Sequence, residues 1–326
     1  MSSEPRQPIQ LTTSAWFDLV YHTLALLPTR ASDASRLHDD GYVAWTQAHL
    51  PAELRALRTL PEDAPRLAAL ADAAPQAYVL QSFVHLHHDV PHFLATAALP
   101  FAEVPWPDRA QQALARLVSQ AVPLELIELL RIALWAEVRG GYPHLRERVL
   151  LPDLDARLQT LRQGLDLAAP SLPGLDAVRW VACHPLRRAG RLLDDGKAAP
   201  TIAIGLPDAE LDVAPLAPVL QGCHEFVLSL VNRHLGPLPG ANPRAGTPGH
   251  ALHVQRETLA LCAGARLLDV PKLRAAQGHW LARIYPHRPA GLVRAWLASG
   301  AALPDGQRPV YEDIAAAIEA SRRSAT

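Results

Sequence analysis

Cysteine is scarce in this sequence, and its spacing excludes two classes of protein. The three cysteines, Cys183, Cys223 and Cys262, are odd in number and widely separated, and none belongs to a CxxC pair. We therefore expect neither a disulfide-linked scaffold nor a zinc ribbon. The same pattern indicates a reducing, cytoplasmic environment.

Long apolar stretches are also absent. No uninterrupted run reaches the roughly 18 apolar residues that a transmembrane helix needs. Residues 1–10 are polar and contain Pro5 and Pro8 where a signal peptide would have an apolar segment. We expect no membrane span and no signal peptide.

Charge and motif content exclude further classes. The net charge is −1 and 19% of the residues are charged, so no basic surface for nucleic acid is indicated. The sequence contains no GxGxxG, GxxxxGK[ST] or GxSxG motif and no kinase motif set, which disfavours a nucleotide-dependent enzyme. With 49% hydrophobic residues, the chain can build a full globular core.

Helical periodicity is the strongest positive signal. Apolar residues recur at helical spacing, and prolines and glycines separate the segments. His22 falls within the first of these helices and is interpreted as a residue at the edge of its packed face. A Pro/Gly-rich segment at 168–174 predicts a helical region, 1–170, and a second region, 171–326, packed as one compact unit. The helices expected in the first region span about 13–27, 32–49, 51–57, 61–73, 108–121, 123–138 and 151–165.

Strands are expected at the start of the second region. Residues 177–183 and 200–206 alternate and are rich in β-forming side chains, and residues 188–193 could add a third strand that ends in a turn at 194–196. The predicted fold is therefore mainly α, a helical array with a small antiparallel β-sheet that precedes a helix at about 218–235.

A dense histidine cluster lies in the first region. Its members are His85, His87, His88 and His92. The density suggests a metal site, but Pro91 breaks a helix before the last histidine, and Asp89 is placed to cap the next helix. Histidines near a helix C-terminus are also favoured by the helix dipole without any ligand. Both the metal and the structural interpretations stay open.

The helix at 218–235 carries the strongest candidate site. Its faces are almost entirely apolar, yet it contains His224 and Glu225. Burying a carboxylate and an imidazole is costly unless they pair or bind a ligand. A later helix, from Thr247 to about residue 268, places three more candidate ligands on one face, because they are separated by three and four residues. They are His250, His253 and Glu257.

These elements resemble the gluzincin type of zincin metallopeptidase between about residues 178 and 268. In that family a strand lies beside a helix that carries His-Glu-x-x-His, and a glutamate on a later helix is the third zinc ligand. The resemblance implies that His224 and Glu257 bind zinc and that Glu225 is the general base. It also implies a peptide or protein as substrate or partner.

The chain departs from the family motif at Leu228, which stands where the second histidine belongs and cannot bind a metal. Two alternatives follow. Either the site is degenerate and the fold serves another purpose, or His253 or His250 supplies the missing ligand, because four residues separate His253 from Glu257 on one helix face.

Two classes of function therefore remain. The first is a zincin-like, zinc-dependent hydrolase in which Glu225 activates the attacking water. The second is a non-catalytic helical binding or scaffold protein that has lost the metal site, with Glu225 in a buried ion pair with Arg256 or Arg233. Cysteine catalysis at Cys183-His184 or Cys223-His224 is disfavoured, because apolar surroundings raise the pKa of a thiol.

Overall fold

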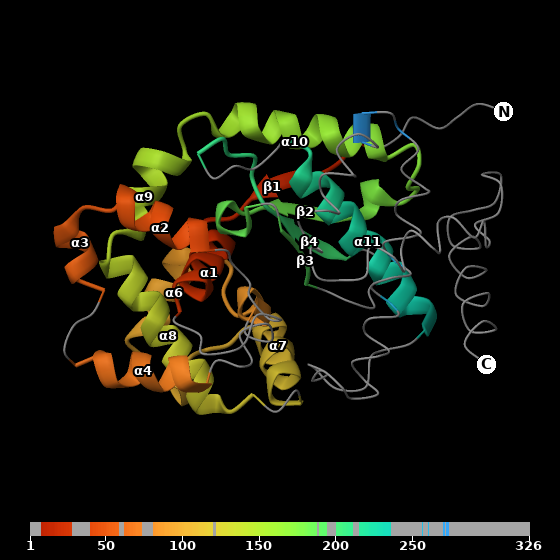
Figure 1. Ribbon diagram of the computed structural model, residues 1–326. Coiled ribbons are helices and arrows are strands. Elements are labelled where there is room, and N and C mark those ends of the chain that lie inside the picture. The colour runs from red at the N-terminus through yellow and green to blue at the C-terminus, as the bar shows by residue number, and fades with distance from the viewer. Residues whose placement is uncertain are drawn as a thin grey trace. The chain divides into compact units, whose positions relative to one another are not determined.

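The computed structural model describes residues 8–27, 40–58, 62–73, 81–119, 122–187, 189–193, 200–210 and 215–235, and residues 256, 260, 270, 272 and 273 individually. The chain divides into two compact units (Figure 1). The helical unit comprises residues 13–155 and 183–187, and the sheet unit comprises residues 1–12, 156–182 and 188–326. The boundary predicted at residue 170 lies within the sheet unit, and the packing of the two units as one body stays a prediction.

The helical unit has α1 and α8 at its centre, since α1 packs against α2, α6 and α8, and α8 packs against α4, α6 and α9. Short 3-10 segments occur at η3 (Gln81–His85), η4 (Phe101–Glu103) and η7 (His184–Leu186), and a π turn occurs at Arg146–Leu150. The α-helices are α1 (Ala15–Leu26), α2 (Asp40–His49), α3 (Ala52–Ala56), α4 (Ala64–Ala73), α6 (Val90–Ala97), α7 (Asp108–Ser119), α8 (Leu124–Arg139) and α9 (Tyr142–Leu145).

The boundaries of these helices follow from their capping residues. Ser14 precedes α1 and accepts a hydrogen bond from the N–H of Phe17, which satisfies one of the unbonded donors of the first turn. Helix α8 ends at Gly140, whose N–H bonds to the carbonyl of Ala136. The helices expected over 13–27 and 123–138 are therefore confirmed.

The sheet unit contains four described strands in the order β1-β2-β4-β3. They are β1 (Leu11–Thr13), β2 (Arg179–Ala182), β3 (Gly190–Leu192) and β4 (Thr201–Ile204). Strands β2 and β4 are parallel, with Trp180 opposite Ile202, whereas β3 pairs antiparallel to β4. The sheet is mixed, so the expectation of a wholly antiparallel sheet is corrected, while the mainly α fold class is confirmed.

The parallel pair has a physical reason in burial. Every residue of β4 and all of β2 except Arg179 are buried, as is typical of parallel strands covered on both faces. Alternation in so short a segment identifies a strand but gives no information on the direction of its partner. The fourth strand, β1, joins through the N–H of Trp180, which donates to the carbonyl of Gln10.

Two long helices complete the described part of the sheet unit, α10 (Leu154–Ala168), whose first two residues belong to the helical unit, and α11 (Ala217–Leu235). Helix α11 packs against β3 and β4 and lies beside the sheet in Figure 1. Gly222 allows this close approach, because a Cβ atom there would lie only 2.7 Å from side-chain atoms of both Ile204 and Trp180.

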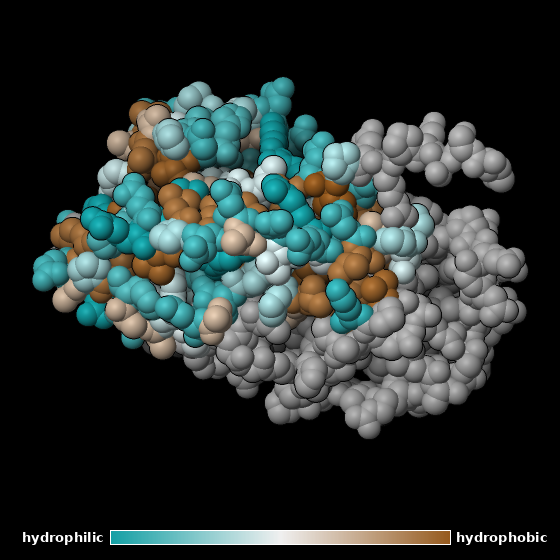
Figure 2. Space-filling model, turned by 90° about the horizontal axis from the view of Figure 1, so that it is seen from above, coloured by the Kyte–Doolittle hydropathy of each residue, from teal (hydrophilic) through white to brown (hydrophobic). Residues whose placement is uncertain are grey.

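None of the described helices combines the length and the apolar character that crossing a bilayer requires. Figure 2 shows hydrophilic residues interspersed with smaller groups of hydrophobic ones on the described surface that faces the viewer.

Candidate functional site

The His-Glu pair of α11 divides between two environments. His224 is 3% exposed and lies between the buried Cys223 and the half-buried Glu225 along the helix. The imidazole therefore belongs to the packed side of α11, and the carboxylate belongs to its margin. Leu228, at the position of the missing family histidine, is half-buried.

The carboxylate of Glu225 binds the edge of the sheet. Its Oε2 accepts a hydrogen bond of 3.2 Å from the N–H of Leu192 in β3, and its Oε1 accepts one of 2.9 Å from Nε2 of Gln221, one turn earlier in α11. The N–H of Leu193, the residue after β3, donates to the carbonyl of Thr201 in β4, so the alternation of a strand directs the N–H of Leu192 away from β4. Glu225 thus satisfies a donor that the strand itself leaves open.

The zinc ligand set is only partly described. Of its members, His224 lies in the described part of the chain, while His250, His253 and Glu257 lie outside the described residues. No group of three or more histidine, cysteine, aspartate or glutamate side chains placed to hold a metal ion occurs among the described residues. The approach of these four residues to one another stays a prediction.

Arg256, which is described individually, contacts α11. It is helical and 6% exposed, and its guanidinium donates to Oδ1 of Asn232 at 3.1 Å. Asn232 lies eight positions after His224 in α11.

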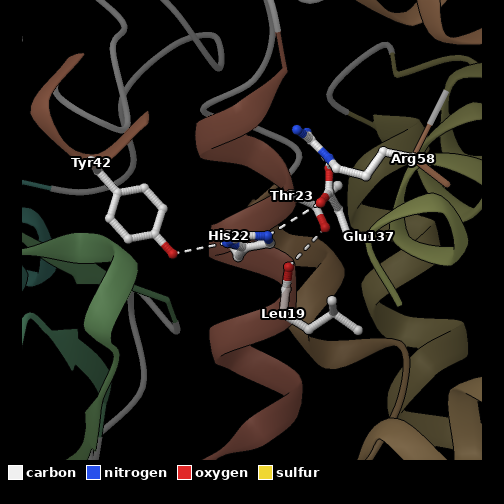
Figure 3. A network of polar contacts seen from close by, with 6 residues as sticks. All are labelled: Leu19, His22, Thr23, Tyr42, Arg58 and Glu137. Carbon is white, nitrogen blue, oxygen red and sulfur yellow. Dashed lines mark hydrogen bonds and ion pairs between the residues drawn. The ribbon is translucent and has the colours of Figure 1, made fainter. Parts of the chain in front are cut away.

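The helical unit contains a second network of polar side chains, which the sequence did not predict. His22 of α1 is fully buried, with Nδ1 at 2.9 Å from the hydroxyl of Tyr42 and Nε2 at 3.2 Å from Oε2 of Glu137 in α8 (Figure 3). A carboxylate can only accept, so Nε2 of the imidazole carries a proton and, in the neutral ring, the Tyr42 hydroxyl donates to Nδ1.

Arg58 completes this network as the counterion of Glu137. Its Nε and one terminal nitrogen donate to Oε1 of Glu137 at 2.9 and 2.6 Å. Burial alone would raise the pKa of Glu137, but the hydrogen bond and charge of His22, together with Arg58, lower the pKa below its ordinary value. Gly140 makes room for the arginine, since a Cβ atom there would lie 1.9 Å from Cγ of Arg58.

Asp18 places a further buried charge beside this network. It is 6% exposed, and its Oδ1 accepts the N–H of His184 at 3.0 Å. Burial and the charge of Asp18 raise the pKa values of Tyr42, Tyr142 and Cys183 well above their ordinary ranges. These groups are therefore neutral at physiological pH, which suits a structural role.

The thiols agree with the expectation that cysteine catalysis is disfavoured. Cys183 and Cys223 are free and fully buried. Burial raises the pKa of Cys223 to about 12, so the nucleophilic thiolate is negligible near neutral pH.

The histidine cluster separates into distinct contacts. Asp89 caps α6 by accepting the N–H of His92 at 2.8 Å, which confirms its predicted role. His85 accepts a hydrogen bond from Arg109 through Nδ1 at 2.8 Å. His87 is 4% exposed, and its Nδ1 lies 3.1 Å from Nδ1 of His92.

Comparison with protein-family models, curated proteins and solved structures gives no match to this chain.

Proposed function

We propose that the protein is a zincin-like, metal-dependent hydrolase of peptides or proteins, in which Glu225 accepts the proton of the attacking water. The observation that carries the proposal is the position of this carboxylate. It is half-buried at the margin of α11, next to the edge strand β3, and Gln221 and the N–H of Leu192 orient it.

The surrounding elements support the proposal. Strand β3 lies at the edge of the sheet and packs against α11, which matches the strand beside the active-site helix of the resembling family. The Arg256–Asn232 hydrogen bond supports the proposal, because Arg256 immediately precedes Glu257 in the sequence and contacts the same helix. A cytoplasmic location is part of the proposal and agrees with the free thiols of Cys183 and Cys223.

The fit of zinc to the described residues is incomplete. His224 offers an imidazole, but Leu228 cannot bind a metal, and no described residue completes a set of three ligands. We assign the remaining positions to His253, His250 and Glu257, outside the described residues. A bound zinc ion would polarise the scissile carbonyl, and the chain's own contribution is the proton acceptor at Glu225.

A non-catalytic scaffold or binding protein is the second candidate, and one observation favours it. Both oxygens of Glu225 already accept hydrogen bonds, from Leu192 and from Gln221. A carboxylate held in this way fixes α11 to the edge of the sheet and needs no catalytic role to explain its presence in an apolar helix.

Two variants separate the candidates. In Glu225→Gln one carboxylate oxygen becomes an amide that cannot accept, so one of the two hydrogen bonds is lost, at a cost of about 1–2 kcal/mol in stability whatever the function. Gln221→Met is the matched control, because it removes one of these hydrogen bonds and leaves the carboxylate in place.

The measurements are the zinc content of protein purified without chelators and the cleavage of a peptide library. We expect zinc in the wild type, one equivalent less in His224→Gln, and hydrolysis by the wild type and Gln221→Met but not by Glu225→Gln. The hydrolase proposal would be contradicted if the wild type contained no zinc and cleaved no peptide. If Glu225→Gln and Gln221→Met then lost similar amounts of stability, the scaffold role would be the remaining candidate.

A further inference from the structure

We propose that His87 and His92, in the helical unit, form a binding site for a divalent transition-metal ion that is separate from the His-Glu helix. The two Nδ1 atoms are 3.1 Å apart. A tetrahedral zinc ion with metal–nitrogen distances of about 2.0–2.1 Å would hold two imidazole nitrogens roughly 3.3 Å apart. The pair therefore has nearly the separation of two ligands of one ion.

The surroundings of His87 direct its lone pair toward His92. The ring of His87 is in T-shaped contact with the rings of Trp16 and Phe93, with ring centroids 4.9 and 5.4 Å away. Its Nε2 is buried and has no hydrogen-bond partner among the described residues. In the tautomer with the proton on Nε2, the lone pair is on Nδ1, the atom that lies 3.1 Å from His92.

The burial of His87 also suits a metal ligand. Its side chain is 4% exposed, and burial disfavours the charged imidazolium form, whereas a metal binds the neutral imidazole. A direct hydrogen bond between two neutral imidazoles is the alternative explanation of the same distance, and it needs no ion.

The charged side chains near His87 and His92 influence the expected affinity for the metal ion. Arg131 opposes a second cation, although its guanidinium donates to the carbonyls of Thr96 and Leu99. Asp89, which caps the helix of His92, adds a carboxylate in the same turn. With two imidazoles and no third protein ligand among the described residues, water completes the coordination. Imidazole selects zinc, copper or nickel over magnesium or calcium.

Substitutions that preserve the fold test the pair. His92→Gln is compatible with α6, because glutamine is favoured three residues after a capping aspartate, and it removes the imidazole. His87→Phe keeps the aromatic packing and removes Nδ1. His144→Gln, on α9, is the matched control for loss of a histidine elsewhere in the unit. Each variant is prepared in the wild-type chain and in a His224→Gln background, which removes the described ligand of the other proposed site.

Isothermal titration of the full chain with Zn²⁺ gives the readout. In the His224→Gln background we expect one equivalent to bind, with or without the His144→Gln control substitution, and the affinity to fall at least tenfold when His92→Gln or His87→Phe is added. Equal binding by all variants would place the ion elsewhere and overturn the proposal. Absence of binding to the His224→Gln protein would also overturn it and leave the pair as a hydrogen bond. Circular dichroism of each variant confirms that it is folded.

Discussion

Replacing Glu137 by glutamine should destabilise the helical unit through the charge that it removes. Glu137 is 5% exposed and accepts two hydrogen bonds from Arg58 and one from His22. Glutamine has nearly the same shape but no charge, and its amide nitrogen would face a donor. The substitution therefore tests the electrostatic contribution with little change in packing.

The magnitude follows from the exposure of the partners. Removing one member of a buried ion pair costs about 3–5 kcal/mol when the other charge stays buried. The side chain of Arg58 is 23% exposed and can regain water, so the cost should lie near about 2–3 kcal/mol. For a unit of this size, each kcal/mol lowers the melting temperature by roughly 2–4 °C, which gives a decrease of about 4–12 °C.

The effect should depend on pH in one direction. The pKa of Glu137 is lowered in the folded protein, so its contribution is present above the unfolded value and is lost as the pH falls through the folded value. The difference between the wild type and Glu137→Gln should be constant from about pH 7 to pH 5 and shrink below about pH 4.

Calorimetry at pH 7 and pH 3, with hydrogen exchange of the α8 amides to locate the change, provides the assay. Glu128→Gln is the matched control, since Glu128 is an exposed glutamate on the same helix and should change stability by less than about 1 kcal/mol. A decrease for Glu137→Gln no larger than that of the control at pH 7, or a full decrease that persists at pH 3, would refute the reasoning.

Three further substitutions test other features. His87→Phe should make the free energy of unfolding less sensitive to acid. The pKa of His87 is lowered to about 3 in the folded protein, so this residue should cost the wild type about 1.4 kcal/mol of stability per pH unit below about 6.5. Denaturant titrations at pH 6.5 and 4.5 should show a smaller loss of stability in the variant. Gly222→Val should destabilise the sheet unit by about 1–3 kcal/mol in thermal melts through overpacking against the sheet, and an unchanged melt would contradict the close approach. Gly140→Ala should displace Arg58 and lower the melting temperature, but should add little in an Arg58→Ala background, which lacks the Cγ atom that the new methyl group would meet, and additive effects would argue against this contact.

Local sequence signals predicted the helices well. Capping and periodicity located α1, α8 and α11, because both are properties of neighbouring residues. The cap at Asp89 was predictable for the same reason. The sheet was less accessible: β1 has three residues, too few for a periodic signal, and it becomes a strand only by pairing with β2, about 170 residues later in the chain.

For the polar sites, the sequence predicts that a buried polar side chain needs a partner, but it does not identify that partner. The sequence indicates that Glu225 needs a partner, but one partner is the backbone N–H of Leu192, which a search for side-chain pairs cannot identify. Periodicity likewise places His22 on a packed helix yet gives no sign of Glu137, which lies 115 positions further along the chain. A pattern predicts the face on which a residue lies, whereas tertiary folding determines what it meets.

The route of the chain between the two units has a consequence for synthesis and for truncation. Residues 183–187 complete the helical unit, although they lie between strands of the sheet unit, and residues 1–12 belong to the sheet unit, although they precede the helical unit in the chain. A fragment that ends at residue 155 lacks the backbone donor of His184 for Asp18. The nascent chain therefore cannot finish the helical unit until residue 187 has left the ribosome, or the sheet unit until α11 has done so, and contacts of such high sequence separation favour slow folding. Excised fragments should fold poorly, whereas the intact chain can complete both units together.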